Sequence, residues 1–372
     1  MTLLRPLLTR VSEDVLLVAL LLALAPLLLW MPDQIGTLHR LVDWKTIGAL
    51  AGLLVLSRGL EDSGYLAHAG RRLLAHIHGE RALAALLVLF AAGLSAVVTN
   101  DVALFIVVPL TLGLRAVAHL PIGRLVIFEA LAVNAGSTLS PVGNPQNLFL
   151  WQSSPLGFFE FTLAMLPLGL GLVALLLVTI PFAFPPARIA AADTAGMAPT
   201  LERGLLWLSL ACYVPFLVLA DLGHSTAAAL TVIALYLFLY RRVLGGVDWL
   251  LLGVFVLMFI DLGLVARLPL LRELAAGIEH LPGGVFTAAV LLSQGISNVP
   301  AAIFLAGFTD DVRALAWGVS VGGFGLAIGS LANLIALRLA REPGLWREFH
   351  AWSVPTLVAG ATLAAALMPL WR

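Results

Sequence analysis

The sequence predicts an all-α polytopic membrane protein with two inverted repeats, each containing a re-entrant helical hairpin and a broken transmembrane helix. Three observations lead to this prediction: the composition, apolar blocks of membrane length, and a pattern of polar breaks that occurs twice. Hydrophobic residues make up 61% of the 372 residues and charged residues only 11%, whereas soluble domains carry about 25% charged residues. A water-soluble fold of this composition would lack the polar residues needed to cover its surface.

The apolar blocks approach the length of roughly 20 residues that a helix needs to cross a bilayer. They lie at residues 15–30, 162–184, 205–220, 249–265 and 356–370. The first block is expected to be a permanent span, because no small-residue cleavage site of a signal peptide follows it. The lipid bilayer is therefore the expected surrounding of the chain, and a bacterial plasma (inner) membrane is its expected location.

The charge balance and cysteine content exclude several classes of protein. The net charge is zero, so no basic patch favours nucleic acid as a partner. Cys212 is the only cysteine, which excludes an internal disulfide or a cysteine metal cluster. We expect no cofactor other than a coupling ion, Na⁺ or H⁺.

The order of the segments predicts the repeats. Residues 1–42 form an N-terminal span and loop, residues 43–184 the first repeat, residues 185–204 a cytoplasmic linker, and residues 205–372 the second repeat. Each repeat opens with an Asp-Trp pair before a span. A hairpin with a polar tip follows at residues 83–112 and 285–308, and then a Gly-broken helix at residues 125–150 and 314–337. Repeats that contain discontinuous helices are typical of secondary transporters.

A gapless alignment of the two broken helices also supports the repeat. Aligning residues 134–150 with 320–336 pairs Gly136 with Gly322, Gly143 with Gly329, and Asn147 with Asn333. These identities alone are weak because glycine is abundant. The common order of parts is the stronger argument.

The basic residues predict the topology. With the N-terminus in the cytoplasm, nine full crossings and two hairpins place fifteen of the 21 basic residues inside and six outside. This distribution satisfies the positive-inside rule. The first hairpin then enters from the cytoplasm and the second from outside, so the repeats are inverted. Reading either hairpin as two true spans would give the same sidedness.

The binding site is expected at the hairpin tips and broken helices, because irregular backbone at membrane depth is tolerated only where protein buries it or where it lines a wet cavity. Unwound carbonyls suit a hard cation, and half-helix N-termini attract anions. The first polar run extends from Gly136 to Asn147 and includes Ser140 and Gln146. The candidate site residues are Thr99, Asn100, Asp101, Gly136, Ser137, Thr138, Gly143, Asn144, Asn147, Ser297, Asn298, Gly322, Gly323, Gly329 and Asn333. The alternative is that the glycines only pack helices tightly and the asparagines form structural hydrogen bonds.

Three acidic residues are candidates for proton coupling, because ionisable groups in a membrane are costly and functional by default. They are Asp101, Glu129 and Asp261. Each has another interpretation. Asp101 would cap a half-helix, Glu129 would pair with Arg124 near the cytoplasm, and Asp261 would lie at the outer interface.

At these residues the sequence resembles the ion transporter superfamily, which includes arsenite permeases, citrate and dicarboxylate/sodium symporters, and NhaD-type sodium/proton antiporters. The resemblance is carried by Thr99-Asn100-Asp101, by Ser297-Asn298-Val299 and by the run from Gly136 to Asn147, and it covers residues 43–337. It implies a scaffold and a mobile transport domain, often in a homodimer, that work by alternating access. It also implies that Thr99 and Asn100 hold one Na⁺ and that Ser297 and Asn298 hold its counterpart.

The third position of each tip departs from the family pattern, which has Thr where this sequence has Asp101 and Val299. An acid there would repel a dicarboxylate and suits proton coupling. We therefore expect a secondary transporter of a small ion, an inorganic or carboxylate anion, coupled to H⁺ or Na⁺. A sodium/proton antiporter on the same fold is the alternative, and an intramembrane enzyme is a third hypothesis that no metal-ligand set or catalytic dyad supports.

Overall fold

The computed structural model describes residues 15–65, 68, 79–114, 120–189, 200–265, 267–269, 277–340, 342 and 344–371. Over these residues the chain is helical and forms no β-strand beyond one isolated bridge between Gly79 and Arg188. The predicted all-α class is confirmed. Outside the described residues lie positions 1–14 of the N-terminal segment and 190–199 of the predicted linker.

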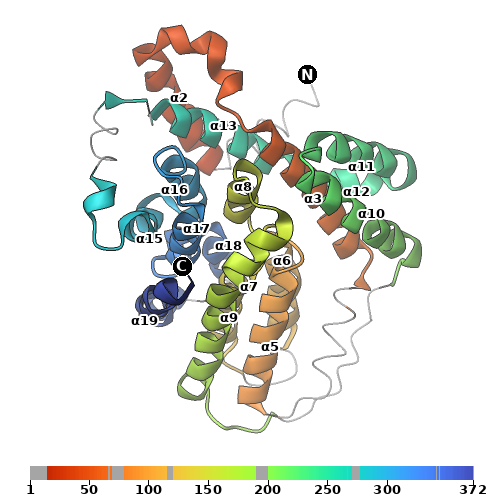
Figure 1. Ribbon diagram of the computed structural model, residues 1–372. Helices are drawn as coiled ribbons and strands as arrows, with labels where there is room; N and C mark the ends of the chain where they lie inside the picture. The colour runs from red at the N-terminus through yellow and green to blue at the C-terminus, as the bar shows by residue number, and fades with distance from the viewer. Residues whose placement is uncertain are drawn as a thin grey trace.

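The helices follow the predicted order (Figure 1). The first half contains α2 (Val15–Trp30), η1 (Pro32–Arg40), α3 (Trp44–Asp62), α5 (Glu80–Ser95), α6 (Asn100–Gly113), α7 (Ile122–Ser137), α8 (Pro145–Ser153) and α9 (Phe158–Ala183). The second half contains α10 (Arg203–Asp221), α11 (Ser225–Leu239), α12 (Arg241–Gly246), α13 (Trp249–Val265), η3 (Ile278–His280), α15 (Gly284–Ile296), α16 (Asn298–Leu305), α17 (Val312–Gly322), η4 (Ala327–Gly329), α18 (Leu331–Ala340), α19 (Leu345–Leu367) and η5 (Met368–Trp371).

The two Asp-Trp pairs begin their helices in the same way. Asp43 accepts hydrogen bonds from the backbone N–H groups of the first turn of α3, and Asp248 accepts one at the start of α13. The indole N–H of each tryptophan donates to the carbonyl five residues earlier, at 3.0 Å for Trp44 and 2.8 Å for Trp249. Two segments distant in sequence therefore share one local structure.

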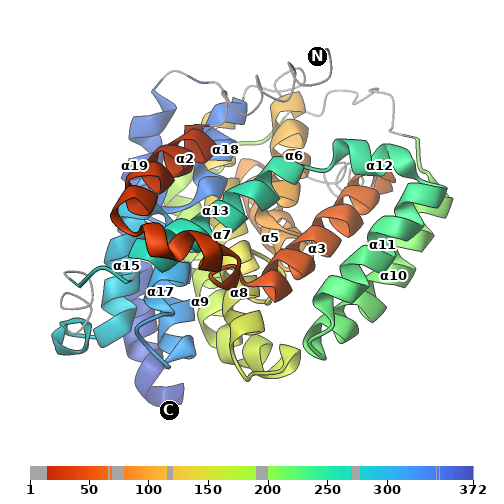
Figure 2. The same cartoon turned by 90° about the horizontal axis from the view of Figure 1, so that it is seen from above.

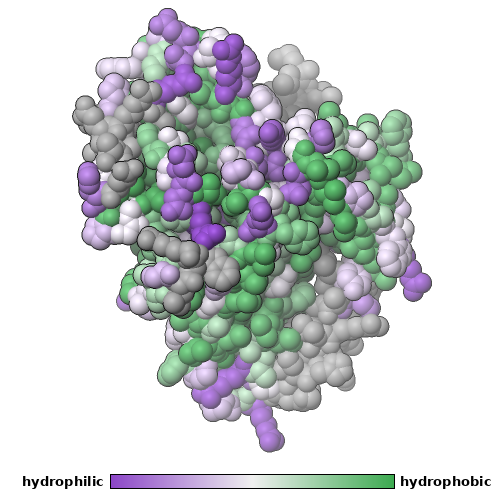
Figure 3. All heavy atoms as spheres, in the orientation of Figure 1, coloured by the Kyte–Doolittle hydropathy of each residue, from purple (hydrophilic) through white to green (hydrophobic). Residues whose placement is uncertain are grey.

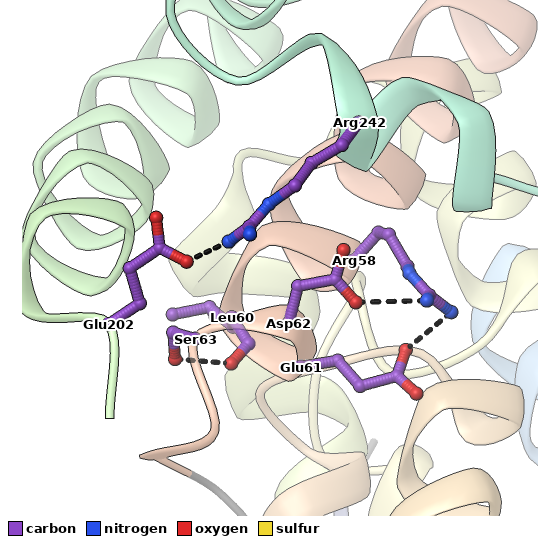
Figure 4. Close-up of polar contacts among 7 residues, drawn as sticks. All are labelled: Arg58, Leu60, Glu61, Asp62, Ser63, Glu202 and Arg242. Atoms are coloured by element: carbon purple, nitrogen blue, oxygen red, sulfur yellow. Dashed lines mark hydrogen bonds and ion pairs between the residues drawn. The ribbon is translucent and has the colours of Figure 1, made fainter. Parts of the chain in front are cut away.

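Helix α3 is longer than the predicted span at residues 44–56, because it continues to Asp62. Arg58 makes this extension favourable by pairing with Glu61 at 3.3 Å and with Asp62 at 2.9 Å, one turn further along the helix (Figure 4). Glu202 lies beside this end, where its carboxylate pairs with Arg242. The polar end of α3 is thus joined to the beginning of α10 and to α12.

The helices form two groups in both ribbon views (Figures 1 and 2). Helices α3, α10, α11 and α12 pack on one another at one side. On the other side, α15, α17 and α19 lie away from that group, and α6, α7 and α8 lie between. Helix α13 packs against α2, α3 and α16 and so contacts both groups.

The outer faces of the helices are apolar. On α10 and α11, Trp207 is 67% exposed and Phe238 is 85% exposed, and hydrophobic side chains gather over this side of the molecule (Figure 3). Exposed apolar patches of this kind mark contact with lipid or protein. Three helices are long and apolar enough to cross a membrane by length and composition: α9, α10 and α19. The chain is a polytopic membrane protein, and the nine crossings remain a prediction.

Candidate functional site

The first hairpin tip and the first helix break are bonded to each other. The tip joins α5 to α6, and the break joins α7 to α8. The backbone N–H of Asn100 donates to the carbonyl of Gly143 at 3.0 Å, and the hydroxyl of Ser140 donates to the carbonyl of Ala96 at 2.6 Å. The structure therefore brings the predicted residues of this pair together.

Two asparagines hold the first break in shape. Asn144 is the N-cap of α8, where its side chain accepts from the N–H of Asn147 at 2.8 Å. The side-chain amide of Asn147 donates to the carbonyls of Ser137, Thr138 and Ser140 at 3.2–3.3 Å. These bonds satisfy carbonyls that the end of α7 leaves without helical partners.

Glycine is required where α5 and α7 cross and where the break folds back. A Cβ on Gly136 would lie 2.1 Å from the carbonyl oxygen of Ala92, and a Cβ on Gly143 would lie 2.5 Å from that of Ser137. Both contacts are with backbone, which cannot move aside cheaply. These two glycines allow the hairpin and the broken helix to approach closely.

The first pair leaves several buried oxygen atoms without a hydrogen-bond partner. They are Thr99 Oγ1, Asn100 Oδ1, Gln146 Oε1 and Asn147 Oδ1. All four residues are at most 5% exposed. Buried polar atoms normally have partners, so each exception requires an explanation. Gln146 belongs to the polar run but not to the predicted site set. Its position beside Asn147 is the signal that could have identified it.

The second hairpin turns at one residue. Ser297 connects α15 to α16 with φ of 73°, and among the described residues it is the only non-glycine with positive φ. Asn298 follows at the start of α16 with its amide nitrogen buried and without a partner. A Cβ on Gly323 would lie 3.1 Å from this nitrogen and 3.1 Å from Asn134 Oδ1. The second tip thus approaches both broken helices at Gly323.

Side chains from other helices hold the second break. Gln294 of α15 donates to the carbonyl of Gly322 and accepts from the N–H of Leu326, both at 2.8 Å. On α19, Ser353 accepts from the N–H of Gly325 at 2.8 Å, and His350 accepts from that of Ala327 at 3.2 Å. Sequence analysis missed Gln294, His350 and Ser353. Only Gln294 carried a signal, as a polar residue just before the tip.

The two broken helices meet at a pair of asparagines. Asn134 of α7 donates to the side-chain oxygen of Asn333 of α18 at 2.8 Å. Asn333 also donates to the carbonyl of Gly323 at 2.9 Å, whereas Asn147 donates to that of Ser137 at 3.3 Å. The gapless alignment pairs these two contacts residue for residue. Asn134 was not in the predicted set, although it lies one turn before the first break.

The three candidate carboxylates lie in separate places. Asp101 is in the first turn of α6, partly buried and close enough to Asp248 for the two to repel each other, and it makes no side-chain capping bond. Asp261 is 3% exposed on α13, and neither of its oxygens has a hydrogen-bond partner.

Glu129 is fully buried on α7, about eight residues before the break, and its Oε1 accepts a hydrogen bond from Thr111. The alternative pairing of Glu129 with Arg124 is wrong, since Arg124 instead pairs with Glu348 at 2.6 Å. No group of three or more His, Cys, Asp or Glu side chains suited to a metal ion occurs among the described residues.

Apolar outer faces, paired breaks and buried polar groups without partners define the class of a membrane transporter. Comparison with known proteins identifies the family. Residues 10–322 match the citrate transporter family, CitMHS, and the chain belongs to this family.

Individual relatives agree with this assignment. The chain is 44% identical to the inner membrane protein YbiR of Escherichia coli over 88% of each chain. It is 31% identical to an uncharacterized transporter of Methanocaldococcus jannaschii over 89% of this chain and 90% of that one. A silicon efflux transporter of Oryza sativa is 32% identical over 37% of this chain and 29% of its own length. The protein is therefore a transporter and not an enzyme, which removes the hypothesis of an intramembrane enzyme.

Proposed function

We propose that the protein is a secondary active transporter that moves a small inorganic or carboxylate anion by alternating access, driven by Na⁺ or H⁺. The family is described as that of citrate transporters, and one relative is named a silicon efflux transporter. These names favour small oxygen-rich solutes.

The observation that carries the proposal is the set of buried oxygens at the first hairpin tip and break. Thr99, Asn100, Gln146 and Asn147 each present an oxygen without a partner. Hydroxyl and amide oxygens are ligands for hard cations. In an apolar surrounding such unpaired oxygens are costly, and a bound Na⁺ would remove that cost. The first pair is accordingly the coupling-cation site of the proposal.

The second pair has the opposite character and suits the anion. Its orphan group at the tip is the amide nitrogen of Asn298, which is a donor. This nitrogen lies at the N-terminus of α16 beside Gly323, where backbone N–H groups add positive potential. No Lys or Arg lies within either tip or break. Anion recognition would therefore rest on amides, helix termini and the bound cation.

The proposal includes two inverted repeats, a cytoplasmic N-terminus and a location in a bacterial inner membrane, where the relative YbiR is named. The recurring asparagine contacts and Asp-Trp helix starts support the repeats. The apolar side formed by α10 and α11 suits either lipid or a second copy, and a homodimer is part of the proposal.

The alternative function is a sodium/proton antiporter on the same fold. It is favoured by Glu129 and Asp261, two buried carboxyl groups without a cationic partner among the described residues. In that case the cation at the first pair would be the substrate, and a carboxylate would carry the exchanged proton.

An uptake panel in proteoliposomes tests the proposal. Purified protein is reconstituted, and labelled citrate, phosphate, arsenite, silicic acid and Na⁺ are offered with and without Na⁺ and pH gradients. Gradient-driven uptake of an oxyanion or carboxylate is expected. Exchange of Na⁺ for H⁺ with no anion flux would replace the proposal with the antiporter. Asn100→Ala, which removes one unpaired oxygen, should raise the Na⁺ concentration for half-maximal uptake, whereas Gln152→Ala on α8 should not.

A further inference from the structure

We propose that Glu129 is a proton-binding site that links the two helices of the first pair, with its carboxyl group held by Thr111. Glu129 is on α7, the helix that ends at the first break, and Thr111 is on α6, the helix that begins at the first tip. Both side chains are fully buried. The inference rests on the proposed function and names its coupling group.

The hydrogen bonds of Glu129 suit a carboxylic acid better than a carboxylate. Oε1 bonds to the Thr111 hydroxyl, and Oε2 is buried without a partner. A carboxylate would leave a charged oxygen in an apolar surrounding, which costs several kcal/mol per ion. An acid leaves only a neutral carbonyl oxygen there, and its O–H can donate to the threonine.

No cation among the described residues compensates the charge of Glu129. Helix α7 packs against α5, α6, α9, α18 and α19. The basic groups on these helices are engaged or directed elsewhere. Arg81 donates to the carbonyls of Phe184 and Pro181, and Arg338 and Arg347 are exposed.

The remaining titratable groups on these helices lie apart from Glu129. Asp101 is at the far end of α6 and Glu160 is at the exposed start of α9. Glu80 is the first residue of α5, and on α19 Glu348 pairs with Arg124 while His350 bonds to Ala327.

The position of Glu129 explains how a proton would act on transport. Eight residues of helix separate it from Ser137, about 12 Å at the usual rise. Eleven residues separate Thr111 from Asn100 on α6, about 16 Å. The Glu129–Thr111 bond thus joins the two helices that carry the first cation site. Release of the proton to water would turn COOH into COO⁻ and require α6 and α7 to separate or to admit water. Asp261 has no such link to a tip or break, and Asp101 is partly exposed.

Infrared difference spectroscopy tests the assignment without any substrate. Spectra of the purified full-length protein in acidic and alkaline buffer should show the C=O stretch of a protonated carboxylic acid that disappears at alkaline pH. Glu129→Gln should remove this band, and Thr111→Val should shift it. Asp310→Asn, which changes an exposed carboxylate between α16 and α17, should leave it unchanged.

The assignment fails if the band persists in Glu129→Gln, if wild-type protein shows no titrating band, or if Thr111→Val leaves the band in place. Glu129→Gln resembles the protonated form and should unfold at the wild-type temperature in acidic buffer. Once a transported solute is known, Glu129→Gln should reduce pH-driven uptake by about tenfold or more while exchange of labelled for unlabelled solute continues. Failure of the infrared result leaves the proposed function standing, whereas absence of any uptake in wild-type vesicles overturns the function and not the proton site.

Discussion

The two breaks are held by different parts of the molecule. In the first, the stabilising side chains Asn144 and Asn147 belong to the broken segment itself. In the second, the stabilising groups come from elsewhere: Gln294 lies on α15, and His350 and Ser353 lie on α19. The first break is thus closed on itself, and the second depends on how α15 and α19 sit against it.

This difference extends to the unpaired polar atoms. The first pair has its asparagine amide nitrogens in use and its oxygens unpaired, whereas the second tip has an amide nitrogen unpaired. A self-contained break with spare oxygens suits a cation that binds to a stable cavity. A break held from outside suits a step in which helices move. The two halves of one repeat pattern have therefore acquired different chemistry.

The largest effect is expected from Gly136→Ala. The added methyl group would lie 2.1 Å from the carbonyl oxygen of Ala92, so α5 and α7 must separate. Because overpacking costs 1–3 kcal/mol and occasionally more, we expect a loss of about 3 kcal/mol or more, measured as folded protein in detergent and its unfolding temperature. Gly93→Ala is the control, since its methyl group meets nothing within 4 Å.

Gly322→Ala, the aligned change in the second break, should cost less, about 1–2 kcal/mol by the same overpacking argument. Its methyl group would meet the Ser293 side chain, with Oγ at 2.5 Å. Ser293→Gly should therefore rescue Gly322→Ala. Equal losses in the two breaks, or no rescue by Ser293→Gly, would remove the distinction between a backbone crossing and a side-chain crossing.

The sequence predicts the first pair better than the second for a physical reason. In an apolar chain, a run of glycine, proline and asparagine within one segment is visible, and Asn144 and Asn147 act within that run. The contacts of His350 and Ser353 join α19 to residues more than twenty positions earlier, and no local pattern reports such a contact. The hairpins, breaks and all-α class were predictable. The extension of α3 to Asp62 and the Asn134–Asn333 pair were not, because both depend on partners that only the fold brings near.

An intermediate effect is expected from Asn147→Leu. The change keeps the approximate size but removes the amide that serves three buried carbonyls. Because unpaired buried groups cost about 1–3 kcal/mol, we expect a loss of about 2 kcal/mol in the unfolding free energy. The Na⁺-induced change in the fluorescence of the nine tryptophans should also disappear. If Na⁺ still changes the fluorescence at wild-type concentrations, the cation site does not lie at the first break.

Gln294→Leu should weaken the second break by about 1–2 kcal/mol, because it removes the bonds to Gly322 and Leu326. Its distinctive result should be faster hydrogen exchange at residues 323–330 with no change at 138–144. Gln152→Leu on α8 is the matched control, since its amide makes only one long bond, to Ala220. Faster exchange in both breaks would show that the second is not held independently of the first.

The smallest effect is expected for the bond between the two breaks. A double-mutant cycle with Asn134→Ala and Asn333→Ala isolates the hydrogen bond at 2.8 Å. Interhelical hydrogen bonds in membrane proteins are worth about 0.6 kcal/mol on average and at most about 1.7, so a coupling energy in this range is expected in unfolding measurements. Asn333→Ala also loses its bond to the carbonyl of Gly323 and should be the more damaging single change. A coupling energy of zero would mean that the two breaks, though adjacent, respond separately, and that any communication between cation and anion sites must pass through α6 and α16 instead.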